Sequence, residues 1–108
     1  MSDIAIIGSG IAGLFSALKL ANAGHNVTVI TKQRLKDSST NWAQGGIAGI
    51  LDKTDIGAKE SHIEDTLKSG DGLCNEEMVR EVIEGAAECI FELVNIGVKF
   101  EKNQQGEF

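Results

Sequence analysis

The feature that most constrains the fold of this sequence is the pattern Gly8-x-Gly10-x-x-Gly13, which directly follows an apolar run at residues 4–7. Apolar residues then recur at helical spacing, and Gly24 stands where a glycine that ends a helix belongs. A second run rich in β-branched residues covers 27–30. The order is strand, glycine turn, helix and strand, which is the context that a dinucleotide-binding loop requires. We therefore predict a βαβ unit over residues 1–31, with two parallel strands buried on both faces.

Each glycine of the pattern has a separate physical role in such a turn. Gly8 permits the tight turn, Gly10 lets the backbone approach a pyrophosphate, and Gly13 lets the helix pack closely on the strand. The free N–H groups at the start of the helix, and the positive end of its dipole, would then face the phosphates. The alternative is a tight turn with a purely structural role.

The residues after the second strand depart from the usual pattern of an NAD site. Such a site has an Asp or Glu there to hold the ribose hydroxyls, whereas this chain has Thr31-Lys32-Gln33-Arg34 and no carboxylate before Asp37. Lys32 and Arg34 would suit a 2′-phosphate, so an NADP site is one alternative. A solvated basic turn is another.

A second segment of small residues follows, and it contains Ser39-Thr40-Asn41 and Gly45-Gly46. The first group supplies hydroxyls and an amide, and the two glycines can bring backbone N–H groups against a ligand at little steric cost. We expect residues 32–51 to contact an extended cofactor between its phosphates and its reactive ring. The alternative is a linker without contacts, which Trp42 and Gln44 disfavour.

Three segments of the chain resemble a known family. Residues 39–49, which contain AQGGIAG, are similar to the flavin loop of the succinate dehydrogenase/fumarate reductase flavoprotein superfamily, and within it the similarity is greatest to the L-aspartate oxidase family. Residues 62–74 (HIEDTLKSGDGLC) and 96–100 (IGVKF) resemble later segments of the same family. GSGIAG at residues 8–13 is shared by many flavoproteins. The resemblance implies that the cofactor is FAD.

Carried over by position, the resemblance places FAD contacts on the first loop, on one lysine and on the second loop. These residues are Gly8, Ser9, Gly10, Ile11, Ala12, Gly13, Lys32, Ser39, Thr40, Asn41, Trp42, Ala43, Gln44, Gly45 and Gly46. Lys32 takes the place of the acidic ribose clamp, as in the resembled family. Ser39 stands where membrane-bound members of the superfamily carry a histidine bonded to FAD, so the resemblance implies FAD held without a covalent link.

The resemblance also implies a reaction: oxidation of L-aspartate to iminoaspartate in de novo NAD synthesis. Hydride would pass from the substrate Cα to the flavin N5, with O2 or fumarate as the acceptor, and quinolinate synthase is an expected partner. Backbone amides near Gly45 and Gly46 are candidates to lie beside the flavin ring. A soluble fumarate reductase-type flavoprotein and a non-catalytic nucleotide-binding module are the alternatives.

We assign no catalytic side chain in this chain. The arginines and histidines are Arg34, Arg80, His25 and His62, and none fits the binding of a dicarboxylate substrate. His25 lies in a turn, and Ser61-x-x-Glu64 reads as a capping box that places His62 in the first turn of a helix. In the resembled family the substrate-binding residues lie beyond the position of Phe108.

The predicted fold class is α/β: a Rossmann-like βαβ FAD-binding unit with parallel strands, incomplete, followed by a helical segment at residues 60–97. Two parallel strands need further strands and helices beside them. We therefore expect residues 1–108 to be the N-terminal part of an FAD-binding domain whose partner is the rest of the same flavoprotein. Alone, they should bind FAD poorly and turn over nothing.

Within the helical segment, Asn75 is a good N-cap for an apolar stripe with Glu76 and Glu77 in its first turn. Gly85 interrupts the stripe and is a candidate break between two helices, and Gly97 ends it. Short strands are expected near residues 47–51 and 98–100.

Composition excludes several classes of partner. The net charge is −6 and the ten basic residues are dispersed, which disfavours nucleic acid and anionic membranes. The sequence has neither a transmembrane run nor a signal peptide pattern, so a cytoplasmic location is expected. Cys74 and Cys89 stand alone, and their spacing suggests neither a metal site nor a disulfide framework.

Overall fold

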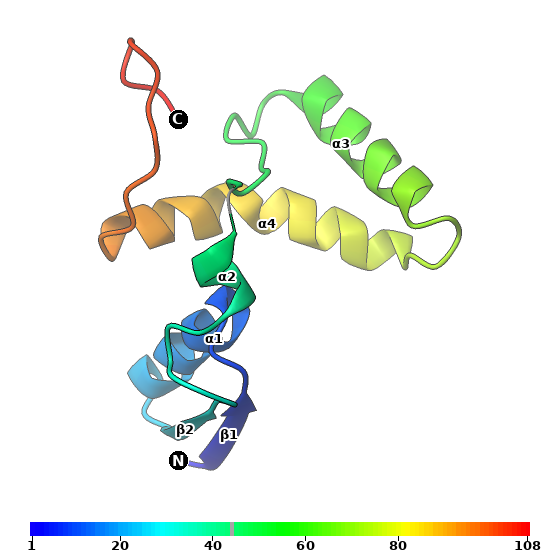
Figure 1. Cartoon of the computed structure of the whole chain (residues 1–108). Coiled ribbons are helices and arrows are strands. Elements are labelled where there is room, and N and C mark those ends of the chain that lie inside the picture. The colour runs from blue at the N-terminus through cyan, green and yellow to red at the C-terminus, as the bar shows by residue number, and fades with distance from the viewer. Residues whose placement is uncertain (44) are drawn as a thin grey trace. The chain divides into compact units, whose positions relative to one another are not determined.

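A computed structural model describes residues 1–43 and 45–108 of the chain (Figure 1). The chain divides into two compact units, Met1–Gly45 and Gly46–Phe108. The first contains the paired strands with one long and one short helix, and the second contains two long helices. This order confirms the α/β class and the succession of a βαβ unit and a helical segment.

The first unit is built on a parallel pair of strands. Strand β1 (Asp3–Ile7), helix α1 (Ile11–Asn22) and strand β2 (Asn26–Ile30) follow one another as predicted. The strands pair in parallel register, with Ile4 opposite Val27, and α1 packs against both of them. The carboxyl ends of both strands therefore lie at one edge of the sheet, next to the start of α1.

Helix α1 ends at Asn22, and Gly24 follows its C-cap, Ala23. Gly24 has a φ of +88°, its N–H donates to the Ala21 carbonyl at 3.0 Å, and the His25 N–H donates to the Leu20 carbonyl at 3.1 Å. This pair of bonds is the Schellman motif, which satisfies the last carbonyls of a helix and favours glycine at the left-handed position. The predicted role of Gly24 is confirmed.

The sheet of the first unit is covered on one face only. Residues along both strands alternate between half-buried and exposed, and Ile7 and Ile30 are 86% and 51% exposed. The expected burial on both faces is therefore not reached in this chain, because a single helix can cover only one face of a sheet.

The second unit has a small apolar core between its helices. Helices α3 (Ile56–Ser69) and α4 (Glu76–Asn95) lie side by side in Figure 1 and pack against each other. The core consists of five buried apolar residues: Ile63, Ile83, Ala87, Ile90 and Leu93. Four of them come from α4 at helical spacing, so the apolar stripe of α4 forms most of this core.

The helix starts are set by capping side chains. Asp55 caps α3, since its Oδ1 accepts from the Ala58 N–H at 2.9 Å. The predicted capping box at Ser61 is wrong, because Ser61 and His62 lie inside a helix that already began at Ile56. Asn75 caps α4 as predicted, with its Oδ1 accepting from the Met78 N–H at 3.0 Å.

Helix α4 runs unbroken through Gly85, so the candidate break there is wrong. A single interior glycine costs a helix about 1 kcal/mol relative to alanine, and burial of the apolar stripe on both sides of Gly85 outweighs that cost. The helix ends at Asn95, and Gly97 terminates it as predicted: the φ of Gly97 is +105°, and the Val98 N–H donates to the Leu93 carbonyl at 3.0 Å.

Residues 47–51 and 98–100 form no strands, contrary to expectation. Gly49 shows why the first of these runs is apolar. A Cβ atom at Gly49 would lie 2.6 Å from Ile90 Cδ1 and 3.3 Å from Ala86 Cβ. The run therefore packs as irregular backbone on α4, and its small apolar residues suit that contact rather than a sheet. Within residues 1–43 and 45–108, no helix has the length and apolarity to cross a lipid bilayer.

Candidate cofactor-binding site

The turn after β1 requires glycine at its first position. Gly8 has a φ of +112°, in the region that side chains with a Cβ atom rarely adopt. Its N–H donates to the Ile30 carbonyl at 2.8 Å. The turn is therefore tied to the carboxyl end of β2.

Gly13 has the role that the sequence predicted for it. A Cβ atom there would overlap the Gly8 carbonyl oxygen and lie 3.4 Å from Ile6 Cγ2. The first turn of α1 thus passes close against the strand and the turn, at a distance that only glycine allows. The same closeness brings the first N–H groups of α1, which have no acceptor inside the helix, to the edge of the sheet.

The two glycine-rich segments meet at the start of α1. Gly10 is the N-cap of the helix and provides no side-chain cap. The Ile11 N–H instead donates to Thr40 Oγ1 at 3.1 Å, across a separation of twenty-nine residues. A Cβ atom at Gly10 would lie 3.3 Å from the same hydroxyl. The predicted phosphate turn and the predicted cofactor loop are therefore in direct contact.

Thr40 is held in place by a short helix that the sequence analysis did not predict. Helix α2 (Ser39–Trp42) begins after Ser38, whose Oγ accepts from the Asn41 N–H at 3.3 Å. The signal was present in Ser38, because serine is a preferred N-cap residue. The four residues of α2 are all exposed, and Trp42 is 74% exposed, so their side chains are accessible to a ligand.

A buried hydroxyl pair joins the glycine turn to the residue after β2. Ser9 is 5% exposed, and its Oγ lies 3.0 Å from Thr31 Oγ1, where either hydroxyl can be the donor. Sequence analysis did not single out Thr31. Its position directly after a strand, at the edge where the glycine turn also lies, was the available signal.

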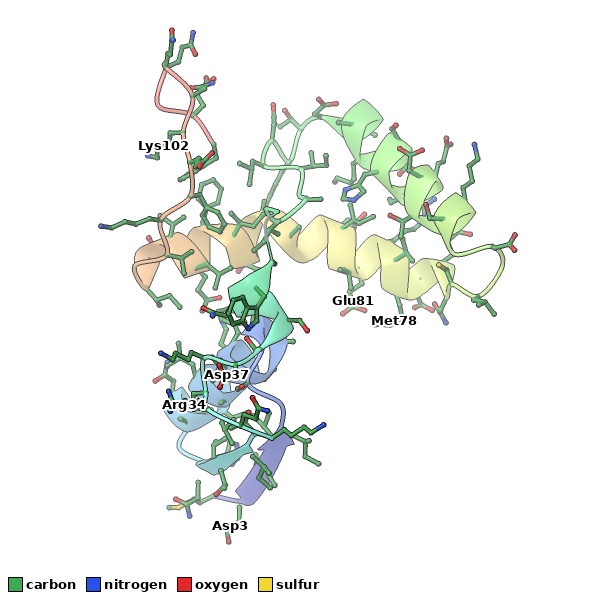
Figure 2. All side chains as sticks on the ribbon, viewed as in Figure 1. Asp3, Arg34, Asp37, Met78, Glu81 and Lys102 are labelled. Atoms are coloured by element: carbon green, nitrogen blue, oxygen red, sulfur yellow. The ribbon has the colours of Figure 1, made fainter. Side chains whose placement is uncertain are left out.

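The basic residues after β2 lie in a turn. The Arg34 N–H donates to Asp37 Oδ2 at 3.3 Å, and the Asp37 N–H donates to the Arg34 carbonyl at 2.9 Å. Figure 2 shows these two residues together. Lys32 is exposed and lies one residue beyond Thr31, at the edge of the sheet that carries the glycine turn.

The remaining predicted site residues are positioned as follows. Ala12 lies in the first turn of α1, and Ala43, Gly45 and Gly46 are exposed. Neither Gly45 nor Gly46 has an atom within 4 Å of where a Cβ would stand, so backbone N–H groups there are open to approach. Gln44 lies outside the described residues.

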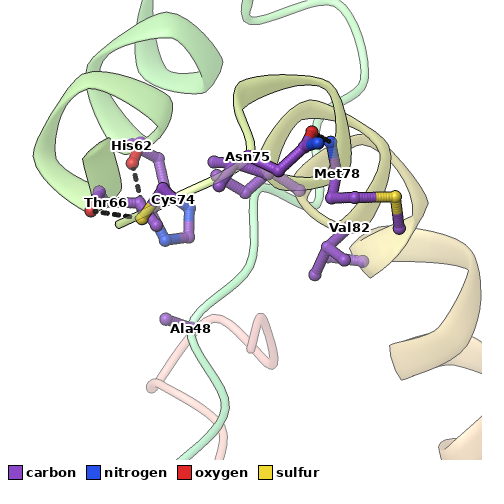
Figure 3. Close-up of a pocket in the computed structure, with 10 residues that line it drawn as sticks. Ala48, His62, Thr66, Cys74, Asn75, Met78 and Val82 are labelled. Carbon is purple, nitrogen blue, oxygen red and sulfur yellow. Dashed lines mark hydrogen bonds between the residues drawn. The ribbon is translucent and has the colours of Figure 1, made fainter. Parts of the chain in front are cut away.

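The second unit has its own cavity, of about 400 Å³. In Figure 3, His62, Thr66 and Cys74 lie on one side of it, and Met78 and Val82 of α4 lie on another. The Cys74 Sγ–H donates weakly to the Thr66 carbonyl at 3.7 Å. In the part of the chain that the structure describes, no group of His, Cys, Asp or Glu side chains could hold a metal ion.

Arg80 binds the two helices of the second unit together. Its Nη1 donates to the Glu60 carboxylate of α3 at 2.9 and 3.1 Å, and its Nη2 lies 3.0 Å from Glu76 Oε1 of α4. The hydrogen bonds to Glu60, and then to Glu76, raise the pKa of Arg80 above its ordinary value. Both carboxylates are therefore engaged with a cation that stays charged, which marks Arg80 as a link between helices.

The geometry of the first unit fits a dinucleotide cofactor. Gly13 lets α1 pack directly against the glycine turn, the free N–H groups of the first turn of α1 lie beside that turn, and Thr40 brings a hydroxyl to the same helix start. Backbone N–H groups and hydroxyls at a helix start are the donors that a pyrophosphate needs. These observations are independent of any relative.

Comparisons with known proteins point to the same cofactor. A family model described as "FAD binding domain" matches residues 3–108. The chain is 40% identical to L-aspartate oxidase of Streptomyces coelicolor over 105 residues, covering 97% of this chain and 18% of the relative. It is 47% identical to L-aspartate oxidase of Pseudomonas aeruginosa over 104 residues, covering 95% of this chain and 19% of the relative.

A plant relative and a solved structure agree with these. The chloroplastic L-aspartate oxidase of Arabidopsis thaliana is 44% identical over 104 residues, with 96% of this chain and 16% of the relative covered. A mutant of E. coli quinol fumarate reductase FrdA superposes with a TM-score of 0.79 at 26% identity, covering 99% of this chain and 19% of that chain. The chain thus spans about a fifth of the length of these relatives.

Proposed function

This chain belongs to the family of FAD binding domains, a part of the succinate dehydrogenase/fumarate reductase flavoprotein superfamily, and from that premise we propose that it forms the FAD-binding N-terminal portion of an L-aspartate oxidase. The whole protein would oxidise L-aspartate to iminoaspartate, with O2 or fumarate as the acceptor, at the start of de novo NAD synthesis. When bound, the cofactor supplies the hydride acceptor. The residues of this chain bind and orient it.

The contact between Ile11 and Thr40 is the observation that carries this proposal. An ordinary dinucleotide turn needs only the first loop, whereas here a hydroxyl of the second loop lies 3.1 Å from the first N–H of α1. A cofactor whose phosphates lie at that helix start would therefore also touch the second loop. This arrangement supports an extended flavin dinucleotide over a nucleotide held by the glycine turn alone.

We assign the roles as follows. The Ala12 N–H binds the pyrophosphate, and the Ile11 N–H does so by exchanging its bond to Thr40 Oγ1 for one to a phosphate oxygen. Gly10 keeps side-chain bulk away from this place. Exposed Lys32 binds the ribose and phosphate side of the cofactor in place of an acidic clamp. Gly45 and Gly46 offer backbone N–H groups to the flavin ring, where they would stabilise charge on the reduced cofactor.

The partners follow from the same proposal. The substrate is L-aspartate, the rest of the flavoprotein covers the open face of the sheet around Ile7 and Ile30, and quinolinate synthase uses the product. We also propose a cytoplasmic location. Cys74 and Cys89 are free thiols, and that is their ordinary state in a reducing compartment.

A fumarate reductase-type activity is the second candidate, and the structural similarity to quinol fumarate reductase supports it. Measurement of hydrogen peroxide formed by the intact protein in air, with L-aspartate added, separates the two. An L-aspartate oxidase forms peroxide in proportion to L-aspartate consumed. Fumarate reduction by a reduced dye, without aspartate-dependent peroxide, would favour the second candidate.

The binding role is tested with the intact protein that contains this chain and with its Gly46→Val variant. We expect the wild type to purify yellow and to lose its visible flavin absorption when L-aspartate is added without oxygen. Gly46→Val should abolish flavin binding or reduction, because it fills a space that is open at Gly46. Normal turnover by this variant would contradict the proposed role of Gly46.

The mode of attachment has its own test. Ser39 cannot form the histidyl link of the membrane-bound enzymes, so acid precipitation of the intact protein should release all of its FAD into the supernatant. Yellow colour retained in the pellet would contradict non-covalent binding, without affecting the assignment of FAD itself.

A further inference from the structure

Ser9 is an unusual residue in the described part of the chain, because it is the one polar side chain there that is buried. It stands inside the glycine turn, between Gly8 and Gly10. Its hydroxyl is paired with that of Thr31 at 3.0 Å, and a buried hydroxyl without a partner would carry a large desolvation penalty. Thr31 is half-buried, so it is the more exposed residue of the pair.

Two hydrogen bonds connect the glycine turn to the end of β2, and the Ser9–Thr31 bond is one of them. The Gly8 N–H donates to the Ile30 carbonyl at 2.8 Å, and the next residue on each side, Ser9 and Thr31, forms the hydroxyl bond. The position of the turn relative to β2 is thus fixed by one backbone bond and one side-chain bond. Only the second depends on the identity of a side chain.

The direction of the Ser9 side chain also limits what Ser9 can offer a ligand. Its hydroxyl is buried against the end of β2. That hydroxyl is bonded to Thr31, whereas the Ile11 N–H at the start of α1 is bonded to Thr40. The turn presents its backbone to a ligand there, and the hydroxyl holds that backbone in place.

We propose that Thr31 is a positioning residue of the FAD site, which acts through the Ser9 hydroxyl to hold the glycine turn in its binding conformation. The inference rests on the proposed function, since it assumes that this turn binds FAD. It has a further consequence: Ser9 contributes to FAD binding through its main chain, and its hydroxyl contributes only through Thr31.

The two halves of the pair should respond differently to substitution. Thr31→Val keeps the shape of the side chain but leaves the buried Ser9 hydroxyl without a partner, so the turn must shift to hydrate it. Ser9→Ala leaves the Thr31 hydroxyl alone, and half-buried Thr31 can bind water instead. In a Ser9→Ala background the hydrogen bond between the two hydroxyls is already absent, so Thr31→Val should cause no further loss of FAD binding.

The test is a double-mutant cycle in the intact protein, with FAD binding to the apoprotein measured by isothermal titration calorimetry. We expect Thr31→Val to raise the Kd for FAD about 10-fold and Ser9→Ala to raise it less than about 3-fold. Adding Thr31→Val to Ser9→Ala should change the Kd by no more than about 2-fold. Thr31→Ser, which keeps the hydroxyl, should bind FAD within about 3-fold of wild type.

Thr28→Val is the matched control, because Thr28 lies in β2, three residues before Thr31, and is opposite Ala5 rather than the glycine turn. It makes the same chemical change and should leave the Kd for FAD unchanged. If Thr31→Val does not fold, the variant that combines Ser9→Ala with Thr31→Val still tests the inference, because it leaves no buried hydroxyl without a partner. It should fold and bind FAD as Ser9→Ala does.

Three results would overturn the inference. The first is a Kd for FAD in Thr31→Val equal to that of the wild type. The second is that Thr31→Val raises the Kd by the same factor in the wild type and in Ser9→Ala, and the third is that Thr28→Val raises the Kd as much as Thr31→Val does. If the wild type reduces its FAD with L-aspartate while any of these holds, only the inference fails. If the wild type binds no FAD, the proposed function fails and the inference fails with it.

Discussion

The two units of this chain are stabilised in different ways. In Met1–Gly45 the informative residues set backbone geometry: Gly8 takes a positive φ and Gly13 allows close approach. Its strands leave Ile7 and Ile30 exposed. In Gly46–Phe108 the informative residues pack, and all five buried apolar residues among the described residues belong to this unit. The backbone geometry of the first unit therefore suits ligand binding, whereas the second unit is stabilised by its own apolar core.

The same residue type can therefore be required by packing in one unit and replaceable in the other. Gly13 and Gly85 are both glycines inside helices, yet a Cβ atom would overlap backbone at Gly13 and meet nothing within 4 Å at Gly85. Isoleucine shows a second contrast: Ile7 and Ile30 of the first unit are exposed, whereas Ile63 of the second unit is buried. Matched substitutions in the two units therefore test this contrast.

The largest effect on stability is expected at Ile63, which is 0% exposed. Ile63→Ala should lower the free energy of unfolding of the chain by about 2–5 kcal/mol, through lost burial and a cavity between α3 and α4. Ile7→Ala, at an 86% exposed position, should change it by less than about 0.5 kcal/mol. Urea unfolding followed by circular dichroism measures both.

The same pair of variants also tests whether the open sheet face is covered in the intact protein. There, Ile7→Ala should become costly, at about 2 kcal/mol or more, because the rest of the flavoprotein would bury it. An equally small effect in both proteins would mean that this face stays open and that the proposed covering is wrong.

The next effect is on cofactor binding. Gly13→Ala places a methyl group against the Gly8 carbonyl, and moving backbone to relieve such overlap costs about 3 kcal/mol, which is roughly a 100-fold rise in the Kd for FAD. Fluorescence quenching of FAD by the intact apoprotein measures it. Affinity within a few-fold of wild type would show that α1 does not pack on the turn as described.

Gly85→Ala should stabilise the chain, whereas Gly13→Ala disturbs its packing. Alanine restores helix propensity in α4 without a contact to disturb, so the free energy of unfolding should rise by about 1 kcal/mol. Thermal unfolding of the chain measures this change, with Gly13→Ala as the paired variant. A loss of stability in Gly85→Ala would show that the open space at this position is occupied.

The smallest effect concerns Asp52, whose carboxylate accepts from the Thr54 hydroxyl at 2.6 Å and from the Thr54 N–H at 2.8 Å. The side-chain bond, followed by the backbone bond, lowers the pKa of Asp52 below its usual 3.8. Since the folded-state pKa is depressed, the stabilisation is present above pH 3.8 and is lost as the pH falls through the folded-state pKa.

Thr54→Val should raise the pKa of Asp52 back toward 3.8, since only the hydrogen bonds from the backbone of residues 54 and 55 remain. Carbon NMR of the side-chain carboxyl group during a pH titration measures both values. An Asp52 pKa that is the same in the variant and the wild type would show that the hydroxyl bond is absent in solution.

Local signals in the sequence were sufficient for most element types and ends. Gly24, Gly97 and Asn75 were predicted from turn and cap chemistry, and each makes the expected bonds. Those predictions succeeded because the bonds join residues within six positions of one another. The parallel pairing of β1 and β2 followed from the βαβ order.

The errors arose where packing outweighed a local signal. Ser61-x-x-Glu64 looked like a helix start, but Asp55 caps the helix a turn and a half earlier. Gly85 looked like a break, yet the buried stripe carries α4 through it. The apolar run at 47–51 looked like a strand, and its Gly49 instead packs on α4.

In the candidate site, the sequence marked both loops but not how they meet. The bond from Ile11 to Thr40 joins residues twenty-nine positions apart, and the one between Ser9 and Thr31 spans twenty-two. No local pattern encodes such contacts, since they depend on where β2 delivers the chain. Thr31 was overlooked for that reason.

The most direct test of the account is the structure of the intact protein with FAD bound. We predict that the backbone of Gly10 to Ala12 and the segment containing Thr40, Gly45 and Gly46 lie within hydrogen-bond distance of one FAD molecule, at its pyrophosphate and toward its flavin ring respectively. A structure in which either segment lies away from the bound FAD would contradict the account.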